Sequence, residues 1–284
     1  MWKGKTRLTF LVLSLLVAIL TVNHNKIALV LNDPYYRPIV LNPIRTFWSR
    51  FLDSHRPQKV ITFHMNQESA FVINLDQDTQ RLKKFMARNK NPPVSRFPAH
   101  KWDIKLDNED EKQIQHFWEM QYPYIKYAAK IGKFGDAACS LSHVSLWQEK
   151  LLNEKGRDYI FVFEDDAKLL APLTSNFIVK APDVADIVLL PKTASKIVSI
   201  PWEGSDNPNP SITSTRAIGG YSAVGYVITK IGAEKMLKAL HSSREPIDLA
   251  FFEASNVRVY LPTPWPLVAH FGVKSSRRSF NLIE

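Results

Sequence analysis

Three consecutive carboxylates, Glu164, Asp165 and Asp166, are the side chains of this sequence with the clearest capacity for chemistry. Adjacent carboxylates repel one another, and burying them without a counter-charge is costly. A divalent cation supplies such a charge, and oxygen-only ligands suit Mg²⁺ or Mn²⁺. The triplet is therefore a candidate metal-binding motif. A solvated acidic turn is the alternative, and the triplet alone favours neither.

The segment before the acids indicates where they lie. Residues 159–163 form a short apolar run, rich in aromatic residues, that follows Gly156. This pattern predicts a buried strand. A buried strand that ends in acids delivers them to the carboxyl edge of a sheet, which is where open α/β folds bind their ligands.

The rest of the chain predicts the same α/β class. Residues 70–75 have a buried-strand pattern, residues 76–79 a polar turn and residues 80–89 a helix with a basic face, as at the start of a nucleotide-binding α/β unit. No glycine-rich phosphate loop is present in the sequence. Further strands are expected at 96–99, 186–190, 225–229 and 257–261, further helices at 136–152 and 232–240, and a long polar binding loop or lid at 191–218.

Cys139 and His143 are four residues apart on the helix expected at 136–152 and could face one direction. A zinc site needs more ligands than these two, so the spacing favours core packing. His143 is likewise interpreted as a core histidine in preference to a catalyst. Cys139 is the single cysteine of the chain, so no internal disulfide can form.

The formal charge of +10 lies mainly on the flanks of the chain. Residues 61–270 hold 25 Lys and Arg against 24 Asp and Glu, so the expected domain is nearly neutral. Flanking charge fits a membrane-proximal segment better than a groove for DNA. We therefore predict no nucleic-acid partner.

The N-terminal residues have the pattern of a signal anchor. Three basic residues precede the apolar run 8–22, and no good cleavage site follows it. We expect an anchor at residues 1–22, a stem at 23–68 with four prolines, and a catalytic domain at 69–284. A cleaved signal peptide is the alternative.

Six segments, in order, resemble glycosyltransferase family 25, the lipooligosaccharide and collagen galactosyltransferase-like family. They span roughly residues 70–270 and comprise Phe71–Asp76 with Arg81, Arg96–Ala99, Gly135–His143 with Trp147, Phe163–Asp166, Gly225–Ile228 with Gly232–Ala233, and Pro246–Asp248. The chain departs from the family pattern at Ala138, where a glycine is usual, and at Gln77, where a basic residue is common.

The resemblance implies a GT-A fold, with a Rossmann-like, mixed and mostly parallel sheet. It also implies transfer of a sugar from a nucleotide sugar, with UDP-galactose as the first candidate, to a glycan or hydroxyl acceptor. Mn²⁺ or Mg²⁺ would be the cofactor. Asp166 would hold the metal with help from Glu164 or Asp165, and the metal would stabilise the leaving diphosphate. The nucleoside would lie against Ile73, Asn74 and Leu75, within reach of Arg81.

Transfer also needs a base for the acceptor proton. Asp248 is the first candidate, and a helix N-cap or a loop hydrogen bond is the alternative role for it. His270 is a candidate third metal ligand or phosphate contact. Gly220, Tyr221 and Ser222 could contact a sugar or form a plain turn.

These expectations describe a single-pass type II membrane protein of the Golgi or endoplasmic reticulum that acts on a glycoprotein or glycolipid. A catalytically inactive relative that binds carbohydrate, or that scaffolds other enzymes, is the competing hypothesis. The intact acids Glu164, Asp165, Asp166 and Asp248 weigh against that hypothesis.

Overall fold

The structure is a computed structural model of the chain. It describes residues 60–101, 109–131, 133–170, 177–191, 194–200, 214–220, 222–243, 245–254, 256–262 and 266–270. All of these belong to one compact unit, Arg56–Glu284.

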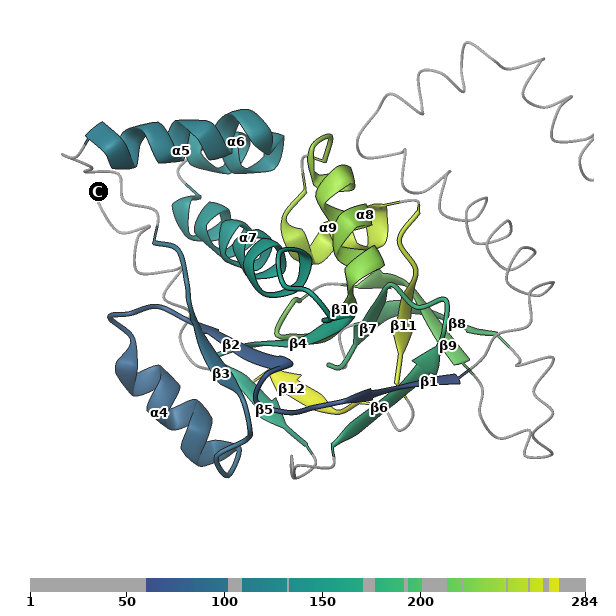
Figure 1. The fold of residues 1–284 in the computed structure, drawn as a ribbon. Helices are drawn as coiled ribbons and strands as arrows, with labels where there is room; N and C mark the ends of the chain where they lie inside the picture. The colour runs from purple at the N-terminus through teal and green to yellow at the C-terminus, as the bar shows by residue number, and fades with distance from the viewer. Residues whose placement is uncertain are drawn as a thin grey trace, which may run out of the picture. The chain divides into compact units, whose positions relative to one another are not determined.

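A central sheet organises the described part of the chain (Figure 1). In spatial order its eight strands among the described residues are β3 (Ser95–Pro98), β2 (Ala70–Asn74), β4 (Tyr159–Glu164), β10 (Gly225–Thr229), β7 (Ile187–Leu189), β11 (Val259–Leu261), β9 (Ser214–Gly220) and β8 (Ala194–Ile200). The pairings leave only β10 and β9 running against the other six strands. The expected mixed, mostly parallel α/β sheet is therefore confirmed.

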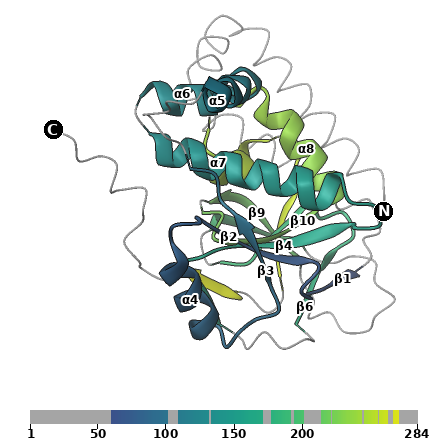
Figure 2. The ribbon, with the colours of Figure 1, turned by 60° about the vertical axis from the view of Figure 1, so that its left-hand side comes forward.

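Helices cover one face of this sheet (Figure 2). They are α5 (Glu109–Gln121), α6 (Pro123–Lys130), α7 (Phe134–Trp147), which continues as the π-helical turn η1 (Gln148–Leu152), α8 (Lys230–Leu240) and α9 (Ile247–Glu253). One buried apolar cluster joins residues of α6 to α9 to β2, β4, β7, β10 and β11.

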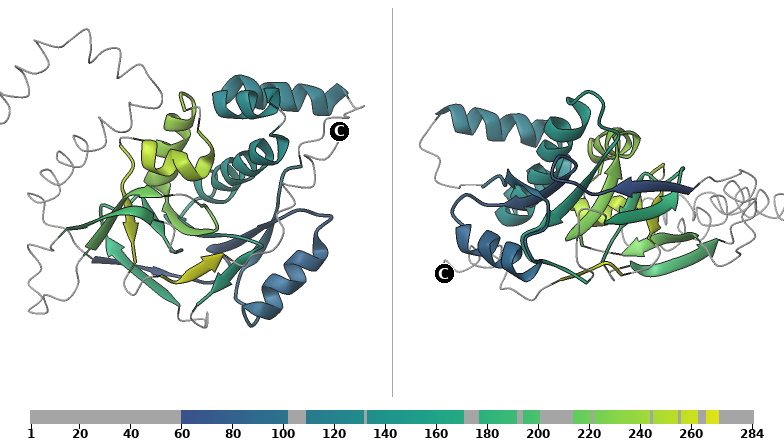
Figure 3. Two further views of the ribbon diagram at one scale, coloured as in Figure 1. Left: turned by 180° about the vertical axis from the view of Figure 1, so that it is seen from behind. Right: turned by 60° about the horizontal axis from the view of Figure 1, so that its bottom comes forward.

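A thinner layer covers the opposite face, as the view from behind shows (Figure 3, left). It contains α4 (Thr79–Arg88) and two antiparallel pairs, β1 (Val60–His64) with β6 (Ile178–Pro182), and β12 (Val268–His270) with β5 (Ala167–Leu169). A second apolar cluster, which includes Phe85 of α4, fills this side.

Strand β4 lies between the two clusters and is buried on both faces. Ile160 and Val162 belong to the cluster beneath the helices, whereas Phe161 and Phe163 belong to the opposite cluster. This alternation follows from the two-residue period of a strand. The continuous apolar run at 159–163 is thus the sequence of a central strand, as predicted.

The prediction of a loop at 191–218 is wrong for part of that segment. Residues 194–200 and 214–220 form β8 and β9, which pair antiparallel and extend the sheet beyond β11. The register shifts between Ala194 and Ile197, so the pairing is irregular at this end of β8. Residues 201–213, with Trp202, lie outside the described residues.

The start of the folded unit also differs from the boundary expected at residue 69. Strand β1, at 60–64, falls in the range assigned to the stem, yet it pairs with β6 and buries Phe63. The predicted anchor, residues 1–22, lies outside the described residues. Within the described ranges, no helix has the length and apolar character needed to cross a membrane.

Candidate active site

The acidic triplet lies where β4 ends, at the carboxyl edge of the sheet. Glu164 is the last residue of β4, and Asp165 and Asp166 form the turn into β5. Both aspartates are buried, with 7% and 5% of their surfaces exposed. The predicted buried strand that ends in acids at the sheet edge is therefore confirmed, and the two aspartates of the turn are buried rather than solvated.

Asp165 is held by two side chains from the neighbouring β2–α4 segment. Asn74 Nδ2 donates to its Oδ2 at 2.7 Å, and the Arg81 guanidinium pairs with its Oδ1. Burial raises the pKa of Asp165. The hydrogen bond from Asn74 and the charge of Arg81 oppose this rise in pKa, and the charge of Glu164 adds to it. Protein side chains thus supply part of the counter-charge that the sequence analysis assigned to a metal.

Asp166 lies in the same basic surroundings but in a looser contact. Its Oδ2 is 3.7 Å from Arg81 NH2. Arg88, about two helical turns further along α4, donates from NH1 to the carbonyl of Ala167 at 3.2 Å. Burial lowers the pKa of Arg88, and the charges of Asp166 and Asp165 oppose that shift. Two arginines of α4 therefore stand beside the two aspartates, as the basic face of the predicted helix allows.

The segment predicted to hold a nucleoside, Ile73 to Leu75, forms the end of β2 beside the triplet. Ile73 is buried among the helices, Leu75 is half-buried, and Asn74 faces Asp165. Arg96 of β3 donates to Asn74 Oδ1 at 3.2 Å and to its carbonyl oxygen at 3.1 Å, and also pairs with Asp76. Sequence reasoning missed this role of Arg96, because only the β2–β3 register places it there.

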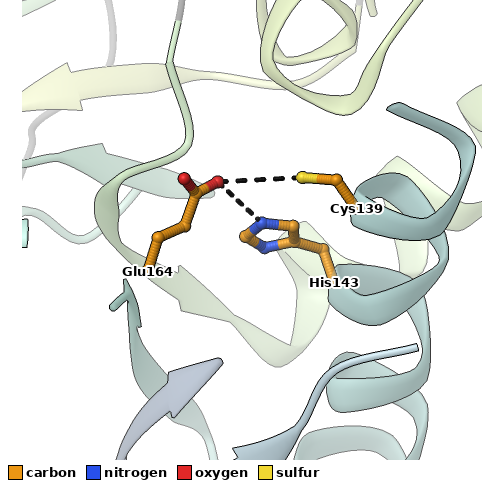
Figure 4. A group of neighbouring side chains, drawn as sticks. All are labelled: Cys139, His143 and Glu164. Atoms are coloured by element: carbon orange, nitrogen blue, oxygen red, sulfur yellow. Dashed lines mark hydrogen bonds and ion pairs between the residues drawn. The ribbon is translucent and has the colours of Figure 1, made fainter. Parts of the chain in front are cut away.

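Glu164 turns to the other face of the sheet, toward α7 (Figure 4). Its Oε1 lies 3.4 Å from His143 Nε2 and 3.8 Å from Cys139 Sγ. His143 Nδ1 lies 2.7 Å from the hydroxyl of Tyr226, which also accepts a hydrogen bond from Trp147 Nε1 at 2.9 Å. The interpretation of Cys139 and His143 as core residues is therefore incomplete, since both face a carboxylate at the site.

Asp248 reaches the same edge of the sheet from the C-terminal half of the chain. It lies in the first turn of α9, and its Oδ2 accepts a hydrogen bond from the backbone of Ser222 at 3.2 Å. Two residues later, the carbonyl of Val224 accepts from the backbone of Glu164 at 3.1 Å. Ser222 has a positive φ of 83°, a strained conformation for a residue with a side chain. The link through Ser222 connects Asp248 with Glu164.

His270, the candidate third ligand, lies on β12 opposite Ala167 of β5. This register brings the backbone of His270 next to the residue that follows Asp166. Tyr221 lies outside the described residues, and Gly220 ends β9.

Comparison with known proteins now identifies the family. The sequence model of glycosyltransferase family 25, described as LPS biosynthesis protein, matches residues 67–251, about two thirds of the chain. The chain belongs to glycosyltransferase family 25. None of the curated proteins that were compared with it matches the chain.

The family-25 match covers the site almost completely. It begins just before β2 and ends within α9, so it includes Arg81, the acidic triplet and Asp248. It ends before β11 and β12, so His270 lies outside it. The chain is thereby assigned to the glycosyltransferases, enzymes that bind a nucleotide sugar and an acceptor.

The three acids of this family-25 chain are not equivalent as metal ligands. Asp165 uses one oxygen for Asn74 and the other for Arg81, whereas Glu164 faces Cys139 and His143. Asp166 is buried at the strand edge with its Oδ2 3.7 Å from Arg81, and its carboxylate is of the type that could hold a hard cation such as Mn²⁺.

Proposed function

We propose that this chain transfers a hexose, with galactose as the first candidate, from a UDP-sugar to a hydroxyl group of a glycan on a glycoprotein or glycolipid. Family membership supports the reaction class. The observation that carries the proposal is the buried carboxylate of Asp166 at the carboxyl edge of the sheet, beside two arginines of α4. Such an edge is the usual ligand site of an open α/β sheet. We propose the GT-A form of that fold for this domain.

Departure of UDP places negative charge on the diphosphate, and that charge must be stabilised as the glycosidic bond breaks. A divalent cation, Mn²⁺ or Mg²⁺, held by Asp166 would supply this stabilisation as a Lewis acid. In this proposal Arg81 is a positioning residue, because its guanidinium holds Asp165 and contacts Asp166. Glu164 and His270 are secondary candidates for the same cation.

The end of β2 is proposed to hold the nucleoside. Ile73, Asn74 and Leu75 lie beside the acids, and Arg96 fixes Asn74 through two hydrogen bonds. Because Asn74 in turn holds Asp165, the nucleoside surface and the acidic turn form one connected unit. A bound nucleoside would therefore place its diphosphate near Asp166.

Asp248 is proposed as the base that takes the proton of the acceptor hydroxyl. Its carboxylate accepts hydrogen bonds from the backbone of Ser222 and of Leu249, which orient it without neutralising its charge. Pro246, not Asp248, is the N-cap residue of α9, so the N-cap alternative is wrong and the alternative to a base is the hydrogen bond to the loop at Ser222. Loss of turnover without loss of stability on substitution would distinguish the base from this structural role.

The test is UDP release from a panel of UDP-sugars, with and without Mn²⁺, for the wild type, Asp166→Asn and Asp186→Asn. Asp186 is the matched control, because it is equally buried but lies before β7, at the opposite edge, where it binds Lys235. We expect metal-dependent release from one UDP-sugar, which Asp166→Asn abolishes and folded Asp186→Asn retains.

Two results would oppose the proposal. Release that does not depend on Asp166 would remove the acidic turn from the mechanism. Absence of release, together with absence of UDP binding in calorimetry, would favour the inactive relative. If UDP binds without turnover, addition of candidate glycan acceptors decides between a missing acceptor and an inactive site.

We further propose attachment to a membrane of the Golgi or endoplasmic reticulum through residues 8–22, whose apolar run after three basic residues supports it. The catalytic domain would then lie on the luminal side. We expect the expressed chain to stay in the membrane fraction after alkaline carbonate treatment, and the chain without residues 1–22 to be released. Extraction of the full chain by carbonate would contradict this proposal.

A further inference from the structure

Cys139 and His143 have no role in the proposed transfer reaction, and Glu164, only a secondary candidate for its cation, faces both of them. Among the described residues, this is the only group of three Cys, His, Asp or Glu side chains whose ligand atoms all lie within 4.8 Å of one another. One thiol, one imidazole and one carboxylate form a ligand set typical of zinc.

The spacing of the three groups fits a tetrahedral ion. Zinc bonds of about 2.3 Å to sulfur and 2.0 Å to nitrogen or oxygen require tetrahedral edges of roughly 3.5 Å between S and O and 3.3 Å between N and O. The Cys139 Sγ to Glu164 Oε1 distance is 3.8 Å, and the His143 Nε2 to Glu164 Oε1 distance is 3.4 Å. These two edges would change by only a few tenths of an ångström on binding. The third edge, from Cys139 Sγ to His143 Nε2, lies within 4.8 Å and would have to measure roughly 3.5 Å around the ion.

The surroundings of His143 also suit a metal ligand. A ligating imidazole usually bonds a fixed polar group through its second nitrogen. Here Nδ1 lies 2.7 Å from the hydroxyl of Tyr226, which Trp147 Nε1 holds from the other side. Tyr226 and Trp147 are completely buried. The ring of His143 is thus oriented so that Nε2 faces Glu164 and Cys139 (Figure 4).

We propose that Cys139, His143 and Glu164 bind a Zn²⁺ ion, separate from any hard cation at Asp166. The thiol loses its proton on binding. The Glu164 side chain is 20% exposed and Cys139 is partly exposed, so the ion has access from the sheet edge. Three protein ligands leave the fourth position for water or a bound ligand, the count found in catalytic zinc sites.

The competing explanation is a metal-free network in which Cys139 and His143 donate hydrogen bonds to Glu164. Cobalt(II) distinguishes the two, because thiolate-bound cobalt has a charge-transfer absorption in the near ultraviolet that a hydrogen-bonded thiol lacks. Cys139 is the single cysteine of the chain, so it is the only source of such a band. Titration of the purified full chain with Co²⁺, without nucleotide sugar, is therefore the test.

We expect a thiolate–cobalt band that one equivalent of Zn²⁺ abolishes. Glu164→Gln and His143→Gln should each weaken cobalt binding by more than about 100-fold, and Tyr226→Phe by about 10- to 100-fold, as for an outer-shell partner. His100→Gln is the matched control, because His100 contacts the same helix α7 through Ser142 and Ser145. It should keep the band unchanged.

The proposal would be overturned if the folded wild type gave no thiolate–cobalt band. It would also be overturned if Glu164→Gln bound cobalt with the affinity of the wild type. Circular dichroism establishes folding of each variant. If the buried His143→Gln variant does not fold, the Glu164→Gln result decides. Since neither UDP-sugar nor turnover enters this test, it stands or falls separately from the proposed transferase function.

Discussion

At the scale of single residues, the site contains charges that the fold has buried. Arg81 and Asp165 form an ion pair whose side chains are 18% and 8% exposed. Removing one member of a buried pair is costly because it leaves the other charge uncompensated, whereas removing both can be nearly neutral. The pair therefore makes a measurable prediction about stability.

Arg81→Met should lower the free energy of unfolding by roughly 3 kcal/mol, because Asp165 then lacks its counter-charge. Adding Asp165→Asn to this variant should restore a large part of the loss. Equilibrium urea denaturation of the two single variants and the double variant measures the coupling. Additive losses would show that the pair contributes no coupling energy.

His100 provides a prediction about pH. Burial lowers its pKa, which the charge of Glu149 opposes. The unfolded imidazole titrates near a pKa of about 6.5, so just below that pH the unfolded state binds more protons. The free energy of unfolding should therefore fall as the pH drops from the unfolded pKa toward the lower folded one.

His100→Gln removes this titration. Its free energy of unfolding should change less steeply than that of the wild type between about pH 7 and pH 5. Urea denaturation at a series of pH values measures both slopes. Parallel slopes would contradict the assignment of this pH dependence to His100.

At the scale of elements, the six adjacent strands from β3 to β11 and helices α4, α7 and α8 could be predicted from local pattern. The strands at 70–74, 159–164 and 225–229 and the helix at 79–88 lie within a residue or two of their expected bounds. Their signals are short-range, namely alternation, apolar runs and flanking turn residues. Strands β8, β9 and β1 could not be predicted, because their stability depends on partners that are distant or irregular in register. Helices α5, α6 and α9 and the short strands β5, β6 and β12 are also absent from the expected elements.

Gly232 shows how closely two elements approach. It lies in the first turn of α8, and a Cβ there would be 2.2 Å from the carbonyl oxygen of Asp186. That oxygen accepts a hydrogen bond from the backbone of Thr229, so it cannot easily move. Close packing against the backbone of Asp186 therefore explains why position 232, in a segment that resembles the family pattern, is a glycine.

Gly232→Ala should lower the free energy of unfolding by roughly 3 kcal/mol, near the upper end for overpacking, despite the better helix propensity of alanine. Gly156→Ala is the control, because its Cβ would meet nothing within 4 Å and only its φ of +78° is unfavourable. This control should cost about 1–2 kcal/mol. Equal losses in thermal or urea denaturation would contradict the clash.

At the scale of the whole molecule, the site draws on distant parts of the chain. The acids come from β4, the arginines from α4 and Asp248 from α9. Residues 222–224, just before β10, connect Asp248 with Glu164. The backbone of Ser222 donates a hydrogen bond to Asp248, and the carbonyl of Val224 accepts one from the backbone of Glu164. This arrangement motivates a test of the proposed base.

Asp248→Asn should lower the turnover number by about 10²- to 10⁴-fold, the usual contribution of a general base, with little change in the KM for the donor. Asparagine still accepts the hydrogen bond from Ser222, so thermal stability should stay close to that of the wild type. Steady-state kinetics with a glycan acceptor measure the effect. A variant that loses stability but retains turnover would indicate a structural role in holding Ser222 rather than a base.

The sequence by itself determined that an apolar strand ends in acids and that a basic helix follows an earlier strand, because strand and helix patterns are local. Only the tertiary structure decided the partners of each acid. Asp165 meets Arg81 from 84 residues away, and Glu164 turns to Cys139 and His143. The reason is geometric. Consecutive side chains of a strand point to opposite faces of the sheet, and the residues that each side chain contacts depend on which elements pack on that face.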